Sequence, residues 1–354
     1  MTRRLASVDA LRGCTVALML LVNDAGDWGH TYAPLEHAQW HGCTLTDLVF
    51  PFFLFVVGVS IALTIGPRIE RGDDRGALAR AAMTRALRIV LLGLAIHVLG
   101  WLLYPGGHMR FPGVLQRIGF CFAVAALFAI YTRARVQWIA IAVILPGYWV
   151  LLLAGGSLEP FVNIASRTDS AIFGRFVYLI DPATGRGHDP EGLLSSFPAL
   201  ATSLLGLRAG QWLRDGSTKS LLVAGVLALL LGYAWSLVLP FNKNLWTSSF
   251  VLWTGGWAML VLALFHALVD RHGWPAMGRR FGMNAVVAYA GSELMQILLP
   301  AWGIQDPLYR RAFASWITPL AGPYVASLAY GVAFVALWWA VVYAMDRRQL
   351  YLKL

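Results

Sequence analysis

The chain has 354 residues, of which 58% are apolar and only 13% are charged, and its mean hydropathy is +0.63. Soluble globular proteins average about 45–50% apolar and about 25% charged residues. The composition therefore excludes a disordered chain, a basic nucleic-acid-binding tail protein and an ordinary cytosolic enzyme. It predicts a polytopic membrane protein.

Hydropathy along the chain predicts an all-α bundle of about ten transmembrane helices, forming a single domain over residues 1–354. One bilayer crossing takes about 20 mostly apolar residues. The first span is the weakest, because its uninterrupted apolar stretch over 14–22 is short. The ten predicted spans are about 6–26, 46–66, 86–104, 113–131, 136–154, 192–212, 219–239, 248–268, 282–300 and 321–345.

The charge distribution predicts how these spans are oriented. The formal charge is +10, from 28 Lys and Arg residues against 18 Asp and Glu residues. With the N-terminus inside, 19 of these cations lie in inner segments and 8 in outer loops, while Arg12 lies within the first span. Because inner loops of membrane proteins are enriched in Lys and Arg, both termini are predicted to be cytoplasmic. Most of the positive charge then reflects topology, and no nucleic-acid partner is predicted.

Three outer loops, at about 27–45, 155–191 and 240–247, hold unusual polar groups, including four of the eight histidines. The segment 155–191 has few apolar runs, so we expect a loop with room for one short helix. The three cysteines are widely spaced and show neither a disulfide framework nor a zinc pattern.

The first outer loop contains two histidines, His37 and His41, four residues apart. This spacing suits a metal pair, but no third ligand follows at a standard spacing, so no metal is predicted. The histidines are either surface residues without chemistry or candidates for a general base, since imidazole accepts a proton near neutral pH. Asp47 is either an N-terminal cap of the second span or a group that orients one histidine.

Ionisable groups at membrane depth are costly and are therefore candidates for function. Arg12 lies three residues after Asp9, so the two can pair on one helical face. Gln116 and Arg117 lie early in the fourth span, and Arg117 is predicted to face the bundle interior and a carboxylate or phosphate. A few inner cations can also hold a phosphorylated cofactor.

Eight short segments, spread in order over residues 5–300, carry a distinctive pattern. They are Val8–Gly13, Val22–Asn23, Glu36–Gly42, Thr46–Phe53, Gly113–Gly119, Asp189–Gly192, Asn242–Trp246 and Gly282–Asn284. Together they resemble the heparan-α-glucosaminide N-acetyltransferase family, which has bacterial relatives among the transmembrane acyltransferases.

This resemblance implies a multi-pass enzyme of a bacterial inner membrane that moves acetyl from cytosolic acetyl-CoA to an amino sugar or glycan on the periplasmic side. The family's catalytic histidine matches His37 and its partner asparagine matches Asn23, whereas His41 matches no family histidine. Homodimers are a family-level expectation. The natural acceptor stays open.

Two chemical routes follow from this resemblance. In the direct route, His37 deprotonates the acceptor as it attacks the thioester; in the covalent route, His37 itself carries the acetyl group. We favour the direct route because it exposes no reactive acyl-imidazole to water. Asn23 is expected to donate to the developing oxyanion and Asp47 to fix the imidazole tautomer. Arg117, Gln116 and Arg12 are the predicted contacts of acetyl-CoA.

The predicted acceptor site combines aromatic side chains, which stack on sugar faces, with amides and carboxylates, which bind hydroxyls and amines. Its members are Trp40, Asp189, Glu191, Asn242, Asn244 and Trp246. Alternative functions are an O-acyltransferase of an envelope glycan, an amino-sugar or muropeptide transporter without chemistry, and a non-catalytic scaffold. A transporter is less favoured because no paired halves are visible.

Overall fold

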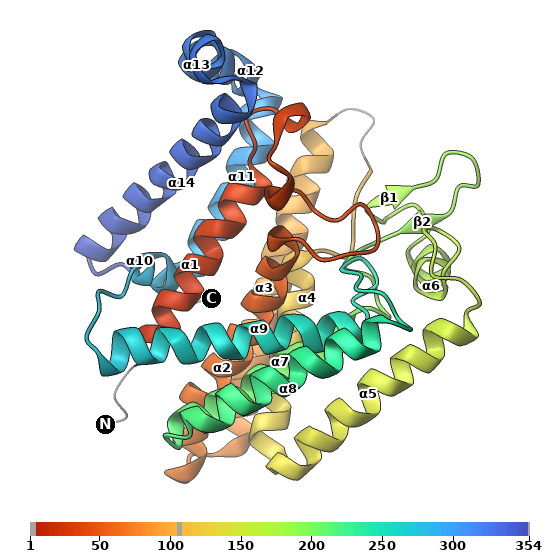
Figure 1. Ribbon diagram of the computed structural model, residues 1–354, viewed down its shortest axis with the longest axis vertical. Coiled ribbons are helices and arrows are strands. Elements are labelled where there is room, and N and C mark those ends of the chain that lie inside the picture. The colour runs from red at the N-terminus through yellow and green to blue at the C-terminus, as the bar shows by residue number, and fades with distance from the viewer. Residues whose placement is uncertain (1–4, 105–107, 353–354) are drawn as a thin grey trace.

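The computed structural model describes residues 5–104 and 108–352 and is almost entirely helical (Figure 1). Within these ranges, eight helices are long and apolar enough to cross a membrane, which confirms an all-α polytopic membrane bundle. They are α1 (Ala6–Asn23), α2 (Leu45–Glu70), α3 (Arg75–Leu103), α4 (Val114–Tyr131), α5 (Ala134–Ala154), α8 (Thr218–Ser236), α9 (Ser248–Phe265) with its π-helical continuation (His266–Arg271), and α14 (Pro323–Arg347).

Two of the ten predicted spans differ from these eight. The predicted span 192–212 is α7 (Ser196–Arg214), which is less apolar because neighbouring helices surround it and accept its polar side chains. Ser203 Oγ, for example, donates a hydrogen bond to a main-chain carbonyl of α2 at 3.1 Å. The predicted span 282–300 is α11 (Ala285–Ala301), which has only 17 residues. Hydropathy therefore supports eight crossings, and ten stays a prediction.

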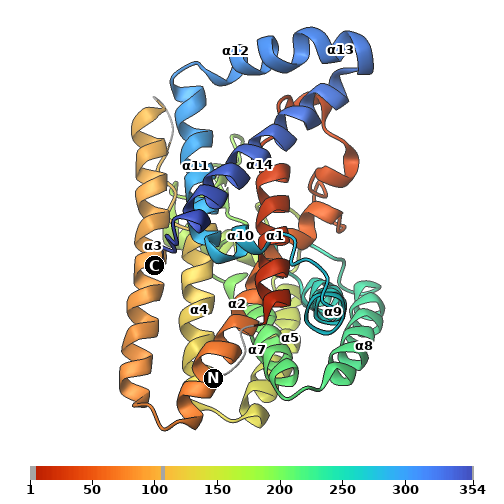
Figure 2. The same cartoon turned by 90° about the vertical axis from the view of Figure 1, so that its left-hand side faces the viewer.

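The sequence predicts no element between 300 and 321, yet this segment is helical. It forms α12 (Gln305–Tyr309), a π-helical turn (Arg310–Ala314) and α13 (Ser315–Ala321). Figure 2 shows that these short helices lie across the ends of α11 and α14. Trp316 and Leu320 are exposed there. A helix that lies in the membrane interface has this kind of orientation and apolar exposure.

Glycines allow α2 and α7 to pack backbone against backbone. A Cβ atom on Gly58 would lie 1.9 Å from the carbonyl oxygen of Ser203, and one on Gly206 would lie 1.9 Å from the carbonyl oxygen of Phe55. Small residues at membrane helix interfaces permit such close approach. The contact fixes α2, which carries Asp47 in its first turn.

Gly206→Val should therefore destabilise the bundle, because the added side chain overlaps the Phe55 backbone. Overpacking of this kind typically costs about 1–3 kcal/mol. We expect the apparent melting temperature in detergent, followed by size-exclusion chromatography after heating, to fall by several degrees. Gly147→Val on α5 is the matched control, since a Cβ there meets nothing within 4 Å. An equal fall in both variants would contradict the proposed packing role.

The connections that form the site gather on one side of the molecule (Figure 1). They are the loop after α1, the α8–α9 connection, and the long α5–α7 connection. The last of these contains α6 (Ile164–Phe173) and an antiparallel hairpin of β1 (Leu179–Ile180) and β2 (Gly187–His188). By contrast, α10 (Arg279–Met283) packs against α1 away from these loops.

Candidate active site

The loop after α1 folds back and brings a histidine to the first turn of α2. It contains two short 3-10 turns, Trp28–His30 and Ala33–Leu35, and ends at Thr44, the N-cap of α2. The main-chain N–H of Thr44 donates to Asp47 Oδ2 at 2.9 Å. Asp47 therefore stabilises the start of α2, which is one of its two predicted roles.

Asp47 also contacts His37, which is its other predicted role. Asp47 Oδ1 lies 2.7 Å from His37 Nδ1, and Oδ2 accepts the N–H of Ala38 at 3.1 Å. The Asp47 side chain is 1% exposed and that of His37 is 46% exposed. Because an ionised carboxylate only accepts hydrogen bonds, His37 Nδ1 carries the proton and Nε2 carries the lone pair.

Lys243, from the α8–α9 connection, approaches the imidazole ring of His37. Its Nζ atom lies 3.0 Å from His37 Nε2 and 3.3 Å from Nδ1. Because these distances are nearly equal, the ammonium lies over the imidazole ring and not in line with the Nε2 lone pair. Burial lowers the pKa of Lys243, and the charges of Glu191 and Asp47 offset only part of this effect. Sequence reasoning missed Lys243, although it is the sole lysine of the predicted outer loops.

His37 faces a cavity of about 680 Å³. Five other predicted site residues line it: Asp47, Glu191, Asn23 at the end of α1, Gln116 in the first turn of α4, and Asn244 beside Lys243. The structure thus brings the predicted histidine and asparagine to one cavity.

Helix α11 contributes two further polar groups to this cavity, Tyr289 and Glu293. They are four residues apart, so both side chains project from the same helical face. One weak indication of this role is present in the sequence. Glu293 is a carboxylate inside a predicted span, and such a group is costly in a membrane unless it faces protein or water.

An arginine and two carboxylates close the cavity on the side of the long loop. Arg110 donates to Asp189 through Nε at 2.9 Å and Nη2 at 2.6 Å, and Nη2 also donates to Glu191. Burial would raise the pKa of Glu191, but the charges of Arg110, Arg117 and Lys243 lower it. Glu191 lines the cavity as an ionised group, whereas Asp189 does not line it.

A comparison with known proteins decides the family. The sequence profile described as "Heparan-alpha-glucosaminide N-acetyltransferase, catalytic" matches residues 4–229. The chain belongs to this family. It is 26% identical to human heparan-alpha-glucosaminide N-acetyltransferase over 420 aligned residues, and 24% identical to the mouse protein over 415. Each alignment covers 99% of this chain and 60% of the relative, so the chain spans about 60% of their length.

The family match confirms the resemblance inferred from the sequence, and the chain is a multi-pass integral membrane protein. Asn23, His37 and Asp47 lie inside the matched region, while Lys243 and Glu293 lie beyond it. The fold brings both parts of the chain to the cavity.

Two predicted ligand contacts are sealed inside the bundle. Arg117 is 2% exposed, and its guanidinium stacks 5.0 Å from the ring of Trp246, which is fully buried. Arg117 Nη2 donates to Ser195 Oγ and to the carbonyl of Gly192, while Nε and Nη1 have no hydrogen-bond partner among the described residues. In this conformation, neither Arg117 nor Trp246 lines the cavity.

Three other predicted contacts also lie outside the cavity. Arg12 pairs with Asp9 at 2.5 Å and donates to the carbonyl of Gly282 at 2.6 Å. Trp40 Nε1 donates to the carbonyl of Leu158 at 2.9 Å. Asn242 is fully buried, and its Oδ1 accepts the N–H of Leu245. In this structure their side chains bind other parts of the protein and do not line the cavity.

A narrow branch of about 80 Å³ leads from the cavity into the bundle. It shares His37, Asn23 and Lys243 with the cavity and continues between apolar side chains. These are Met19, Val49, Phe50 and Val114. The branch is therefore suited to a slender, largely apolar group that reaches His37.

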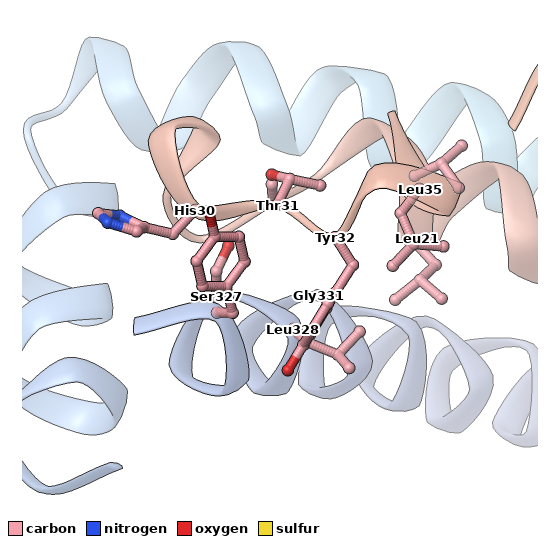
Figure 3. Close-up of a pocket in the computed structure, with 11 residues that line it drawn as sticks. Leu21, His30, Thr31, Tyr32, Leu35, Ser327, Leu328 and Gly331 are labelled. Carbon is pink, nitrogen blue, oxygen red and sulfur yellow. The ribbon is translucent and has the colours of Figure 1, made fainter. Parts of the chain in front are cut away.

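A second, much smaller pocket shows how the His37 loop is held on α14 (Figure 3). The main-chain N–H of Asp27 donates to Ser327 Oγ, and that hydroxyl donates to the carbonyl of Asp27, both at 3.0 Å. The ring of His30 packs edge-on against Tyr324. The pocket volume of about 20 Å³ is near the size needed for one water molecule.

No group of three or more His, Cys, Asp or Glu side chains suited to a metal occurs within residues 5–104 and 108–352.

Asp169 on α6 supports the loop that carries Asp189 and Glu191. Its Oδ1 accepts the N–H of Leu193 at 2.9 Å, while Oδ2 is buried without a hydrogen-bond partner in the described part of the chain. Burial and the nearby charge of Asp189 raise the pKa of Asp169 to about 7.

The raised pKa predicts a pH-dependent stability that Asp169→Asn removes. A carboxyl with a folded-state pKa above its unfolded value of 3.8 stabilises most at low pH, and this contribution is lost as pH rises through about 7. The loss is about 1.4 kcal/mol per pH unit between the two values. We expect the melting temperature of Asp169→Asn to exceed that of the wild type by more at pH 8 than at pH 5. A constant difference would show that Asp169 does not titrate in this way.

Proposed function

We propose that this protein transfers acetyl from cytosolic acetyl-CoA to the amine of a glucosamine-type sugar on the periplasmic side of a bacterial inner membrane. The observation that carries the proposal is the His37–Asp47 pair, whose Nε2 lone pair faces the cavity. Lys243 Nζ lies 3.0 Å from Nε2 and 3.3 Å from Nδ1, so a primary amine can reach the His37 ring within this cavity. The family membership supports the reaction class.

His37 acts as the general base in this proposal. As the sugar amine attacks, His37 Nε2 takes its proton, while the buried Asp47 carboxylate stabilises the imidazolium that forms. The new C–N bond replaces the C–S bond of the thioester, and His37 returns the proton to the leaving sulfur. The acceptor amine approaches Nε2 along its lone pair, and Lys243 and Glu191 line the same cavity as charged groups.

Asn23 lines the same cavity and the same narrow branch as His37, and its amide can donate to the carbonyl oxygen as negative charge develops there. Such donors are typically worth about 10²–10³ in rate. Acetyl-CoA supplies the activated acetyl group, and the narrow branch beside Met19 and Phe50 fits its slender arm. Gln116 is the predicted donor contact that lines the cavity, whereas Arg117 and Arg12 have other partners.

The test is acetyl transfer by the purified protein with acetyl-labelled acetyl-CoA and matched acceptors. Glucosamine should become labelled on nitrogen, and N-acetylglucosamine, whose amine is blocked, should not. Label on a hydroxyl of N-acetylglucosamine with none on glucosamine would replace the proposal with O-acyl transfer. Counterflow of labelled sugar without any acetyl transfer would replace it with transport.

A further inference from the structure

A second hollow of about 340 Å³ continues the active-site cavity sideways, between α3 and α11. The two spaces share lining residues. They are Ile96, His97, Arg110, Tyr178 and Glu293. A ligand in the cavity can therefore extend into the hollow without crossing a wall of the protein.

The inner and outer parts of the hollow differ in chemistry. Charged groups, Arg110 and Glu293, lie at the end shared with the cavity. The outer end is bordered by Trp101 and Tyr104 at the end of α3, by Ile297 of α11, and by His108, whose Nε2 contacts the carbonyl of Val177 at 2.7 Å. Tyr104 also donates from its hydroxyl to the carbonyl of Ile297 at 2.8 Å, which joins the two helices above the hollow.

The mouth of the hollow lies at the end of α3, on the face of this helix that is turned toward α11. In Figure 2, α3 forms one edge of the molecule, with α11 beside it. Trp101 and Tyr104, which border the mouth, are 48% and 38% exposed, whereas the exposed leucines of α3 lie on another face of the helix. Trp and Tyr at the end of a membrane span mark the membrane interface. The hollow therefore opens between exposed aromatic rings at the level of the interface.

We propose that the hollow admits the apolar chain of a lipid-linked amino sugar, whose sugar amine reaches His37 while its chain stays in the outer leaflet. This inference rests on the proposed function and names its acceptor class. A free sugar would occupy only the polar cavity. The adjoining hollow would then stay empty, whereas a sugar with an attached apolar chain would fill both spaces.

The test compares methyl, octyl and dodecyl β-glucosaminide as acceptors for the protein in nanodiscs. We expect kcat/KM to rise at least about tenfold from the methyl to the octyl compound, since burying a few methylenes supplies such a factor. Partition into the bilayer also favours long chains in any variant. The decisive quantity is therefore the ratio of kcat/KM for the octyl compound to kcat/KM for the methyl compound, compared between Gly100→Leu and a control variant. Gly100→Leu fills the hollow, because Gly100 lines it and its Cβ would meet only Ile297 at 3.6 Å.

The matched control is Gly147→Leu, the same substitution at an open position of α5. We expect the ratio to fall toward one in Gly100→Leu and to stay at the wild-type value in Gly147→Leu. The same ratio in both variants, or no chain-length effect in the wild type, would overturn the proposed lipid-chain site while leaving the acetyltransferase activity established.

A binding experiment tests the hollow even if no glucosaminide is acetylated, an outcome that would refute the proposed function. A dodecyl β-glucosaminide with a photoreactive diazirine at the end of its chain is crosslinked to the wild-type protein. Peptide mapping should find the label on α3 near Trp101 or on α11 near Ile297, and excess unlabelled dodecyl glucosaminide should compete. Labelling spread over lipid-facing helices without competition would overturn the inference.

Discussion

His37→Ala is expected to reduce acetyl transfer to glucosamine by at least about 10³-fold, while the protein still folds and inserts into the membrane. General bases contribute about 10²–10⁴ to rate. The expected loss is within this range because His37 Nε2 is the basic atom that the buried Asp47 carboxylate orients toward the cavity. The measurement is turnover with acetyl-labelled acetyl-CoA, after matching size-exclusion profiles and melting temperatures with the wild type.

His41→Ala is the matched control for this prediction. His41 lies in the same loop, four residues further on, and its Nδ1 contacts Asn242 Nδ2 at 3.3 Å rather than a carboxylate. We expect this variant to keep turnover within a few-fold of the wild type. Turnover near the wild-type level in His37→Ala would refute the base and the acetyl-carrier roles together.

The sequence alone located the central pair of this site for a physical reason. His37 and Asp47 are ten residues apart, and the loop between them closes at the capped first turn of α2. Local patterning of this kind is visible in a sequence, because a cap and its helix are neighbours in the chain. The resemblance to the family then favoured His37 over His41 as the candidate catalytic histidine.

The remaining site groups could not be found locally. Lys243 is 206 residues from His37, and Glu293 reaches the cavity from α11, so only the packing of distant helices brings them together. Contacts between distant segments also decide the partner of Arg117. Its depth in the fourth predicted span suggested a phosphate or carboxylate partner, but the fold places its guanidinium over the ring of Trp246. Similarly, Asp189 is a predicted acceptor contact, and the fold pairs it with Arg110 beside the cavity instead of in its lining.

Hydropathy predicted the long lipid-facing helices well and the buried ones less well. α3 and α8 are exposed to lipid along most of their length, so their sequences are strongly apolar. α7 is enclosed by other helices, where hydrogen bonds such as that of Ser203 replace the need for apolar side chains. The helices between 305 and 321 were missed because they are too short to resemble a span.

The second large effect is expected for Asp47→Asn, which should reverse the tautomer of His37. Asp47 Oδ2 accepts the main-chain N–H groups of Ala38 and Thr44. An asparagine must keep its carbonyl oxygen toward these two donors, which places its NH₂ group against His37 Nδ1. Nδ1 must then accept a hydrogen bond, so the ring proton moves to Nε2 and the base function is lost.

We therefore expect kcat to fall by about 10³–10⁴-fold in Asp47→Asn, as when the carboxylate behind a catalytic histidine is replaced by an amide. The helix cap survives, so the melting temperature should change little. Asp27→Asn is the matched control, because Asp27 lies 2.8 Å from His30 Nδ1 in the same loop but away from the cavity. It should retain wild-type turnover. Full activity in Asp47→Asn would show that His37 works without the tautomer that its carboxylate partner imposes.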